Sequence, residues 1–172
     1  FSHLWNVVGQ NITTYTTYPR IVGETGGKNF HLIHPSADLN SAVNQTIRAA
    51  FEYQGQKCSA CSRVYVPKSL WAEFKEQLVE GVRSITMGQP DELEHFMSAV
   101  IDNAALQKHK KYLDIAKNDP RCDILAGGNV DSSIGYFVEP TVILARDPHF
   151  LTMKDELFGP VLTVFVYDDA HP

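Results

Sequence analysis

The sequence predicts an α/β fold, an open mixed sheet flanked by helices. Short apolar runs alternate with stretches whose apolar residues recur every three or four positions, as in strands and amphipathic helices. The last three strand candidates follow one another with little helix between them, which favours a sheet that is partly antiparallel. The length of 172 residues suits about one domain at roughly 150 residues per domain.

The chain opens with a predicted helix and a short predicted strand. Helical spacing ends at Pro19, which cannot continue a helix, and a strand candidate follows at Arg20–Val22. A glycine-rich turn at Gly23–Gly27 then leads to a second strand candidate, Phe30–His34. The apolar residues at helical spacing in the first stretch are Leu4, Trp5, Val8 and Ile12.

Three longer helices are predicted, each preceded by a residue that can cap a helix: Asp38, Ser69 and Asp102. Between the first two, Val64–Val66 is typical of a buried strand, and Pro67 closes it. The apolar-face positions of the three helices are Leu39, Val43, Ile47, Ala50 and Phe51, then Trp71, Phe74, Leu78, Val82 and Ile85, and finally Leu106, His109, Leu113 and Ala116.

The remaining strand candidates are Ile124–Ala126, Phe137–Leu144 and Val161–Tyr167. Turn-forming sequences separate them, among them Gly127–Asn129 and Asp147-Pro148.

Composition argues against two classes of partner. Fifteen basic and twenty acidic residues give a formal net charge of −5, whereas nucleic-acid binders normally show a basic patch or stripe. No apolar run reaches the roughly 20 residues that a membrane helix needs.

Three cysteines are too few for a secreted disulfide framework, so we expect a reducing compartment.

Cys58 is the first candidate for chemistry. It follows a helix in a polar segment with Lys57 and Arg63 nearby, and positive neighbours favour the nucleophilic thiolate. The alternative is a small, half-buried loop cysteine. Cys58-x-x-Cys61 also matches zinc and redox templates, but no second such pair completes a zinc site, and the pair does not precede a helix. We therefore expect no metal site, and Cys122 to be inert.

Two further segments have unusual composition. Glu24 stands among glycines after a strand candidate, where a carboxylate has room to move and, with its pKa raised by burial, could act as a general base; a solvated turn residue is the alternative. Asp155–Pro160 places two acids and an aromatic before a Gly-Pro turn. That arrangement could stack on a flat ligand and hold a sugar hydroxyl, although an ordinary loop would also explain it.

Together these segments resemble the aldehyde dehydrogenase superfamily, over essentially the whole chain. The resemblance rests on four motifs in the family order: Glu24–Asn29, Phe51-x-x-x-Gly55-Gln56-x-Cys58, Gly135–Val142 and Asp155–Val161. Within the superfamily, Tyr18–His31 and Phe51–Arg63 are most similar to the branch that oxidises L-glutamate γ-semialdehyde in proline degradation, the delta-1-pyrroline-5-carboxylate dehydrogenases.

The resemblance implies catalytic roles for two residues. Cys58 would attack the aldehyde carbon, and loss of hydride to NAD⁺ would leave a thioester, which splits one difficult oxidation into easier steps. Glu24 would activate the water that hydrolyses the thioester. The backbone N–H of Cys58 would supply half of an oxyanion hole, whose second donor in the family is an upstream asparagine that this chain does not contain.

The resemblance also implies binding roles. Glu156 would hold the nicotinamide ribose of NAD, Phe158 would pack beside the nicotinamide ring, and Ser59 would contact the amino-acid end of the substrate. The expected partner is a small aldehyde, with no nucleic acid and no membrane.

The family pattern also suggests that this chain is part of a longer protein. Residues 1–25 would be the last helix and strand of the NAD-binding domain, and residues 26–172 a truncated catalytic domain. We therefore expect the isolated chain to be inactive and to self-associate through an edge strand or its apolar first helix. For the whole protein we expect a homo-oligomer in the mitochondrial matrix. Two alternatives stay open: a family member acting on another aldehyde, and a non-catalytic relative that keeps the fold.

Overall fold

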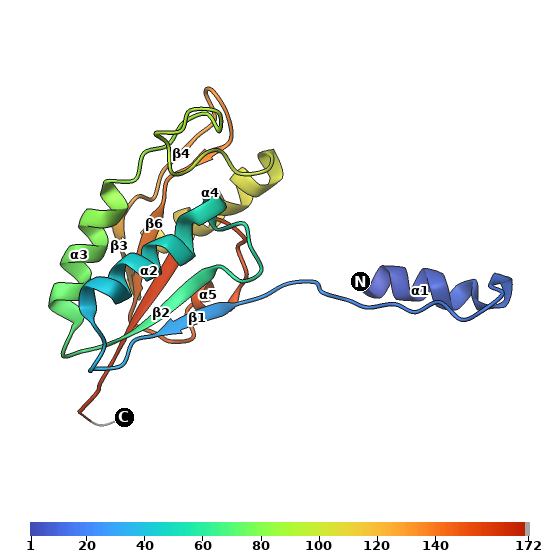
Figure 1. Ribbon diagram of the computed structural model, residues 1–172, viewed down its shortest axis with the longest axis horizontal. Coiled ribbons are helices and arrows are strands. Elements are labelled where there is room, and N and C mark those ends of the chain that lie inside the picture. Colours follow the sequence, from blue (N-terminus) through green and yellow to red (C-terminus); the bar gives the residue numbers. More distant parts are fainter. Residues whose placement is uncertain (171–172) are drawn as a thin grey trace.

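A computed structural model describes residues 1–170 and has a five-stranded sheet at its centre (Figure 1). The strand order is β1-β2-β7-β6-β3. Three neighbouring pairs are parallel and β3 pairs with β6 antiparallel, so the predicted mixed sheet is confirmed. The strand bounds are β1 Asn29–Leu32, β2 Cys61–Pro67, β3 Cys122–Ala126, β6 Thr141–Ala145 and β7 Val161–Tyr167.

Helices cover both faces of this sheet, and alternate strand residues serve the two faces. In β6, Val142 packs with the residues of α2 and α3, whereas its neighbour Ile143 packs with those of α4 and α5. The hydrophobic core is therefore split into two layers by the sheet. The helix bounds are α2 Leu39–Phe51, α3 Trp71–Arg83, α4 Asn103–Asn118 and α5 Leu151–Lys154.

Two of the three predicted caps are confirmed. The Asp38 carboxylate accepts a hydrogen bond from Ser41 N at 2.7 Å, and the Asp102 carboxylate accepts one from Ala105 N at 2.7 Å. Ser69 is wrong as a cap, because α3 begins after Leu70 without a side-chain cap. The Ser69 backbone N–H and hydroxyl donate instead to the Asp169 carboxylate.

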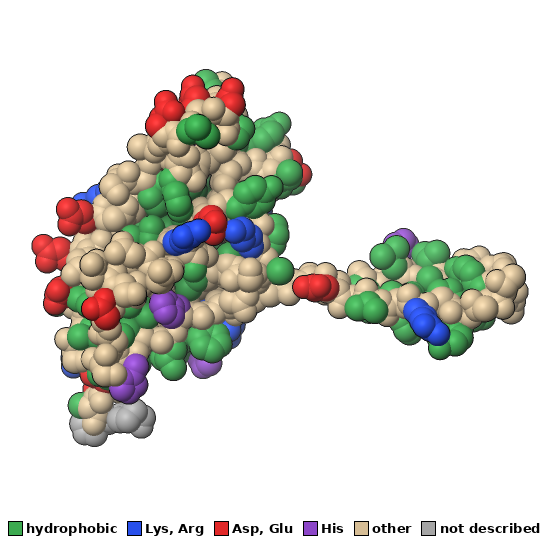
Figure 2. Space-filling view, in the orientation of Figure 1, with side chains coloured by type: hydrophobic (Ala, Val, Ile, Leu, Met, Phe, Trp, Pro, Cys, Tyr) green, Lys and Arg blue, Asp and Glu red, His purple; other side chains and the backbone are tan. Residues whose placement is uncertain are grey.

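The N-terminal segment projects from this body (Figure 1). Helix α1 (Ser2–Gln10) and the short 3-10 helix η1 (Ile12–Thr14) confirm the predicted first helix, but neither contains a buried residue. Figure 2 shows several hydrophobic side chains on the surface of this projecting part. The strand expected at Arg20–Val22 is wrong, because that stretch has no neighbouring strand with which to form ladder hydrogen bonds.

The C-terminal half differs from prediction at two points. The strand expected over Phe137–Leu144 is divided into β5 (Phe137–Val138), which pairs with β4 (Val130–Asp131), and β6. Pro140 lies at the division and has no N–H to give to a ladder. The four-residue helix α5 shows no periodic pattern and was not predicted. No helix among residues 1–170 combines the length and the apolar character required to span a membrane.

Candidate active site

The candidate nucleophile Cys58 is reached through a sharply turned connection after α2. The 3-10 segment η2 (Glu52–Gly55) holds three successive left-handed residues, Tyr53, Gln54 and Gly55, with φ of 55°, 57° and 64°. A side chain at Gly55 would be strained at that φ, and its Cβ would come within 2.5 Å of the Gly159 carbonyl oxygen. Glycine therefore lets this turn approach the Gly159 loop closely.

Hydrogen bonds from a distant segment hold this connection in place. Gln54 Nε2 donates to the carbonyl of Ala99 at 3.1 Å, and Ile101 N donates to Gln56 Oε1 at 2.8 Å. Non-glycine residues in the left-handed region cost free energy and persist where surrounding contacts fix them. Contacts with Ala99 and Ile101 thus fix the turn that presents Cys58.

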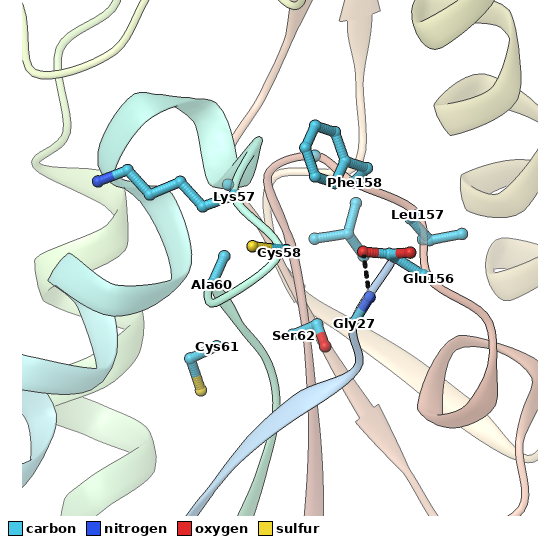
Figure 3. Close-up of a pocket in the computed structure, with 12 residues that line it drawn as sticks. Gly27, Lys57, Cys58, Ala60, Cys61, Ser62, Glu156, Leu157 and Phe158 are labelled. Carbon is cyan, nitrogen blue, oxygen red and sulfur yellow. Dashed lines mark hydrogen bonds between the residues drawn. The ribbon is translucent and has the colours of Figure 1, made fainter. Parts of the chain in front are cut away.

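The three cysteines lie in different environments. Cys58 is exposed, whereas Cys61 and Cys122 are buried. Burial raises the pKa of the Cys61 thiol to about 11, and its Sγ contacts the carbonyl of Arg63 at 3.4 Å. Its side chain points away from Cys58 (Figure 3). Cys58 is therefore the cysteine that an external electrophile can reach directly.

Gly27 lies between the Cys58 loop and the Glu156 loop. Its backbone N–H donates to Glu156 Oε1 at 2.9 Å, as the dashed line in Figure 3 shows. On its other side, an added Cβ would lie 2.3 Å from the Cys58 carbonyl oxygen. The side-chain amide of Asn29, two residues further along the chain, donates to that same oxygen at 2.7 Å. This short segment consequently sets the position of both loops.

All the site residues expected from the sequence line one open cleft of about 650 Å³. Cys58 and Ser59 come from the turn before β2, and Glu24 comes from the projecting segment. The burial expected for Glu24 as a general base is absent: its side chain is exposed, because few other elements pack against this segment. The cleft is lined by Glu24, Thr25, Gly26, Gln56, Lys57, Cys58, Ser59, Lys108, Glu156 and Phe158.

Phe158 presents its ring to the cleft from a strained backbone position. Its φ is +60°, in the left-handed region, and the residue is 44% exposed. On one side Lys108 Nζ donates to the Glu156 carbonyl at 2.8 Å. On the other, Gly159 packs against buried His109, whose Nε2 would lie 1.7 Å from an added Cβ. An exposed apolar ring kept in a costly conformation is a feature of binding sites.

The contacts of two charged residues behind the cleft, Lys28 and Arg63, were not predicted from the sequence. Lys28 Nζ and Arg63 Nη1 donate to the carbonyls of Thr152 and Met153 at 2.8 and 3.1 Å. Burial, followed by the nearby Arg63 charge, lowers the Lys28 pKa to about 8. Lys28 lies within the Glu24–Asn29 motif and Arg63 ends the Phe51–Arg63 stretch, yet nothing in their spacing predicts that they meet.

His31 and His34, three residues apart in the sequence, contact different partners. His31 Nδ1 is 2.8 Å from Thr46 Oγ1 on α2, and His34 Nδ1 is 2.8 Å from Ser36 Oγ. Across residues 1–170, no group of three or more His, Cys, Asp and Glu side chains is placed to hold a metal ion.

Curated relatives match nearly the whole chain. It is 53% identical over 172 residues to the mitochondrial delta-1-pyrroline-5-carboxylate dehydrogenase of Dictyostelium discoideum, covering 99% of this chain and 31% of that protein. It is 54% identical over 170 residues to the enzyme of the same name from Mus musculus, covering 98% and 30%. The chain thus spans about 30% of the length of the curated relatives that it matches.

Solved structures give the same comparison in three dimensions. The chain superposes on the NAD-bound delta-pyrroline-5-carboxylate dehydrogenase of Mycobacterium tuberculosis with a TM-score of 0.91 and 42% identity, covering 99% of this chain and 30% of that one. An NAD⁺ complex of the Bacillus cereus aldehyde dehydrogenase matches with a TM-score of 0.79 and 30% identity, covering 85% and 30%. The family model described as "Aldehyde dehydrogenase family" matches residues 6–171. By sequence and by fold alike, this chain belongs to the aldehyde dehydrogenase family.

Proposed function

We propose that the whole protein oxidises L-glutamate γ-semialdehyde to L-glutamate with NAD⁺, and that Cys58 is its nucleophile. The observation that carries the proposal is one cleft lined by an exposed thiol, an exposed carboxylate, a second, half-buried carboxylate and an aromatic ring. The substrate follows from relatives of this name that are 53% and 54% identical to the chain.

In the first stage the Cys58 thiolate adds to the aldehyde carbon and forms a C–S bond, while the carbonyl oxygen takes the negative charge. The backbone N–H of Cys58 is the group of this chain that can donate to that oxygen, since an oxyanion is stabilised by donors fixed in advance. Collapse of the adduct restores the C=O bond and expels hydride, so that a thioester remains on Cys58.

In the second stage Glu24 accepts a proton from a water that attacks the thioester carbon. The C–S bond then breaks, which releases the carboxylic acid and regenerates the Cys58 thiolate. Glu24 suits this role because its segment is flanked by glycines and opens onto the cleft that contains Cys58.

The residues present fit NAD⁺, which accepts the hydride when bound. The Glu156 carboxylate is anchored through Oε1, and it closely approaches Gly26, where an added Cβ would lie 2.6 Å from Oε2. A glycine at this point leaves room beside the carboxylate, which could accept hydrogen bonds from ribose hydroxyls. The Phe158 ring offers an apolar surface for a flat ring. Ser59 is our candidate contact for the amino-acid end of the substrate.

We also propose the wider organisation expected from the family. Residues 1–25 would belong to the NAD-binding domain and residues 26–172 to the catalytic domain, which agrees with the projecting α1 and its exposed Leu4 and Trp5. The named relatives are mitochondrial, which supports a mitochondrial matrix location. A homo-oligomer remains our proposal for the whole protein.

The test is NADH formation by the whole protein with glutamate γ-semialdehyde, propanal and succinate semialdehyde, for the wild type, Cys58→Ser and Cys122→Ser. We expect a strong preference for the first substrate, loss of activity in Cys58→Ser and retention in Cys122→Ser, the control for a buried cysteine. Preference for another aldehyde would overturn the substrate. If NAD⁺ binds but no NADH forms with any of the three aldehydes, the proposal that the protein is an enzyme is overturned.

A further inference from the structure

The last carbonyl groups of α5 are held by two cations from outside the helix. A helix leaves its final carbonyls without intrahelical partners. In α5 the carbonyl of Thr152 accepts from Lys28 Nζ at 2.8 Å, and that of Met153 accepts from Arg63 Nη1 at 3.1 Å. Thr152 and Met153 are both buried. Cations also interact favourably with the negative end of a helix, so this pair stabilises the end of α5.

The two cations are joined to one another and to the sheet. Arg63 lies in β2, and its Nη2 donates to the Lys28 carbonyl at 3.0 Å. Lys28 directly precedes β1, which pairs with β2. The Lys28–Arg63 pair thus links the sheet edge to α5.

Helix α5 leads directly into the loop that carries Glu156. Two adjacent residues donate hydrogen bonds to α5 and to the loop that follows it. Lys28 Nζ donates to the Thr152 carbonyl, and Gly27 N–H donates to the Glu156 carboxylate at 2.9 Å. Displacement of α5 would therefore move Glu156 relative to Gly27. Because Gly27 also packs on the Cys58 carbonyl, the same movement would separate Glu156 from the nucleophile loop.

Lys28 is surrounded by ionisable groups of both signs. Burial, followed by the Arg63 guanidinium, lowers its pKa to about 8, while Asp155, Glu156 and Cys61 act in the opposite direction. Asp155 is itself bonded by the Tyr112 hydroxyl of α4, at 2.7 Å. Lys28 accordingly loses its proton at a lower pH than an ordinary lysine does.

We propose that Lys28 is a positioning residue for Glu156: its ammonium group anchors the end of α5, and the affinity of the protein for NAD⁺ depends on that charge. This inference rests on the proposed role of Glu156 in holding the cofactor. Lys28 lies outside the residues that line the cleft, so it acts through α5 and the loop. A neutral amine can still donate one hydrogen bond to Thr152, but it loses the charge-assisted part of that interaction.

The test measures NAD⁺ binding to the whole protein by calorimetry, in the absence of aldehyde, at pH values from 7 to 9.5. A Cys58→Ser background keeps thiolate formation out of the measurement. We expect Kd to rise about fivefold across a midpoint near pH 8. Lys28→Met should bind about fivefold or more weakly at pH 7 and show no such midpoint, while Lys28→Arg should bind tightly throughout. Lys154→Met, which removes an exposed lysine of the same helix, is the control and should follow the wild type.

The outcomes separate this inference from the proposed function. If Glu156→Ala binds NAD⁺ as the wild type does, the proposed role of Glu156 fails and this inference fails with it. If Glu156→Ala weakens binding while Lys28→Met leaves both Kd and its pH dependence unchanged, Lys28 does not position Glu156. If Lys28→Met does not fold, the Lys28→Arg profile decides: an inflection near pH 8 as in the wild type would overturn the inference.

Discussion

The backbone N–H of Gly27 donates to the carboxylate of Glu156 at 2.9 Å, across 129 residues of sequence. The same glycine packs against the carbonyl oxygen of Cys58, where an added Cβ would lie 2.3 Å away. One residue thus fixes the separation between the loop that carries the thiol and the loop that carries the carboxylate. Only a residue without a side chain fits between them.

Gly27→Ala should therefore disturb the site and the fold together. The added methyl group meets backbone rather than a flexible side chain, so we expect a loss of about 2 kcal/mol in the free energy of unfolding and weaker NAD⁺ binding. Denaturant titration and calorimetry measure the two effects. Gly9→Ala is the matched control, because a Cβ at Gly9 meets nothing within 4 Å. Equal stability of the two variants would refute the close packing.

The three thiols should react with iodoacetamide in a fixed order. Cys58 is exposed, while Cys61 and Cys122 are buried in the two core layers, so we expect Cys58 to be alkylated about 100-fold faster or more. Peptide mass spectrometry after timed quenching gives the three rates. In denaturant the differences should shrink sharply. Comparable rates for Cys122 and Cys58 in the folded protein would contradict the described burial.

Because of Cys61, the free energy of unfolding should decrease as the pH rises through the alkaline range. Burial raises its pKa from 9.0 to about 11, so between these pH values the folded state keeps a proton that the unfolded state has released. The contribution of Cys61 to the free energy of unfolding is complete below pH 9. About 2 kcal/mol of it is lost as the pH rises toward 11. Denaturant titrations at pH 8 and pH 10.5 should show a steeper loss in the wild type than in Cys61→Ala. Parallel losses would disprove the shift.

Gly159 and His109 should be energetically coupled. A Cβ at Gly159 would lie 1.7 Å from Nε2 of the fully buried His109 ring, so Gly159→Ala should cost about 3 kcal/mol. His109→Ala leaves a cavity and should cost about 2 kcal/mol. In the double variant the new methyl group occupies that cavity, and the loss should be at least about 1 kcal/mol smaller than the sum. Simple additivity would show that the ring does not press on Gly159.

The parts of the fold that follow a local pattern were predicted well. Asp102 caps α4 as expected, and Leu106, His109, Leu113 and Ala116 form its buried face. The strand ending at Pro67 and the partly antiparallel sheet are also confirmed. These features depend on short-range spacing, which a single sequence contains.

The features that were not predicted correctly depend on contacts between residues that are distant in the sequence. Arg20–Val22 has a strand-like composition but no neighbouring strand, and Ser69 bonds Asp169 instead of capping α3. Cys58, Glu24 and the Asp155–Pro160 segment stood out by residue type and surroundings, but their roles were assigned through family resemblance and remain predictions. The contacts of Lys28 and Arg63 with α5 could not be predicted, because they join residues that are 124 and 90 positions apart in the sequence.

The proposed oxidation passes through a thioester on Cys58 that Glu24 helps to hydrolyse, and a variant without the Glu24 carboxylate should trap that thioester. The whole protein carrying Glu24→Gln is mixed with NAD⁺ and glutamate γ-semialdehyde, quenched in acid and digested for mass spectrometry. We expect a burst of about one NADH per active site and an acyl group on the peptide that contains Cys58. Sustained turnover at the wild-type rate, or an acyl group on any residue other than Cys58, would contradict it.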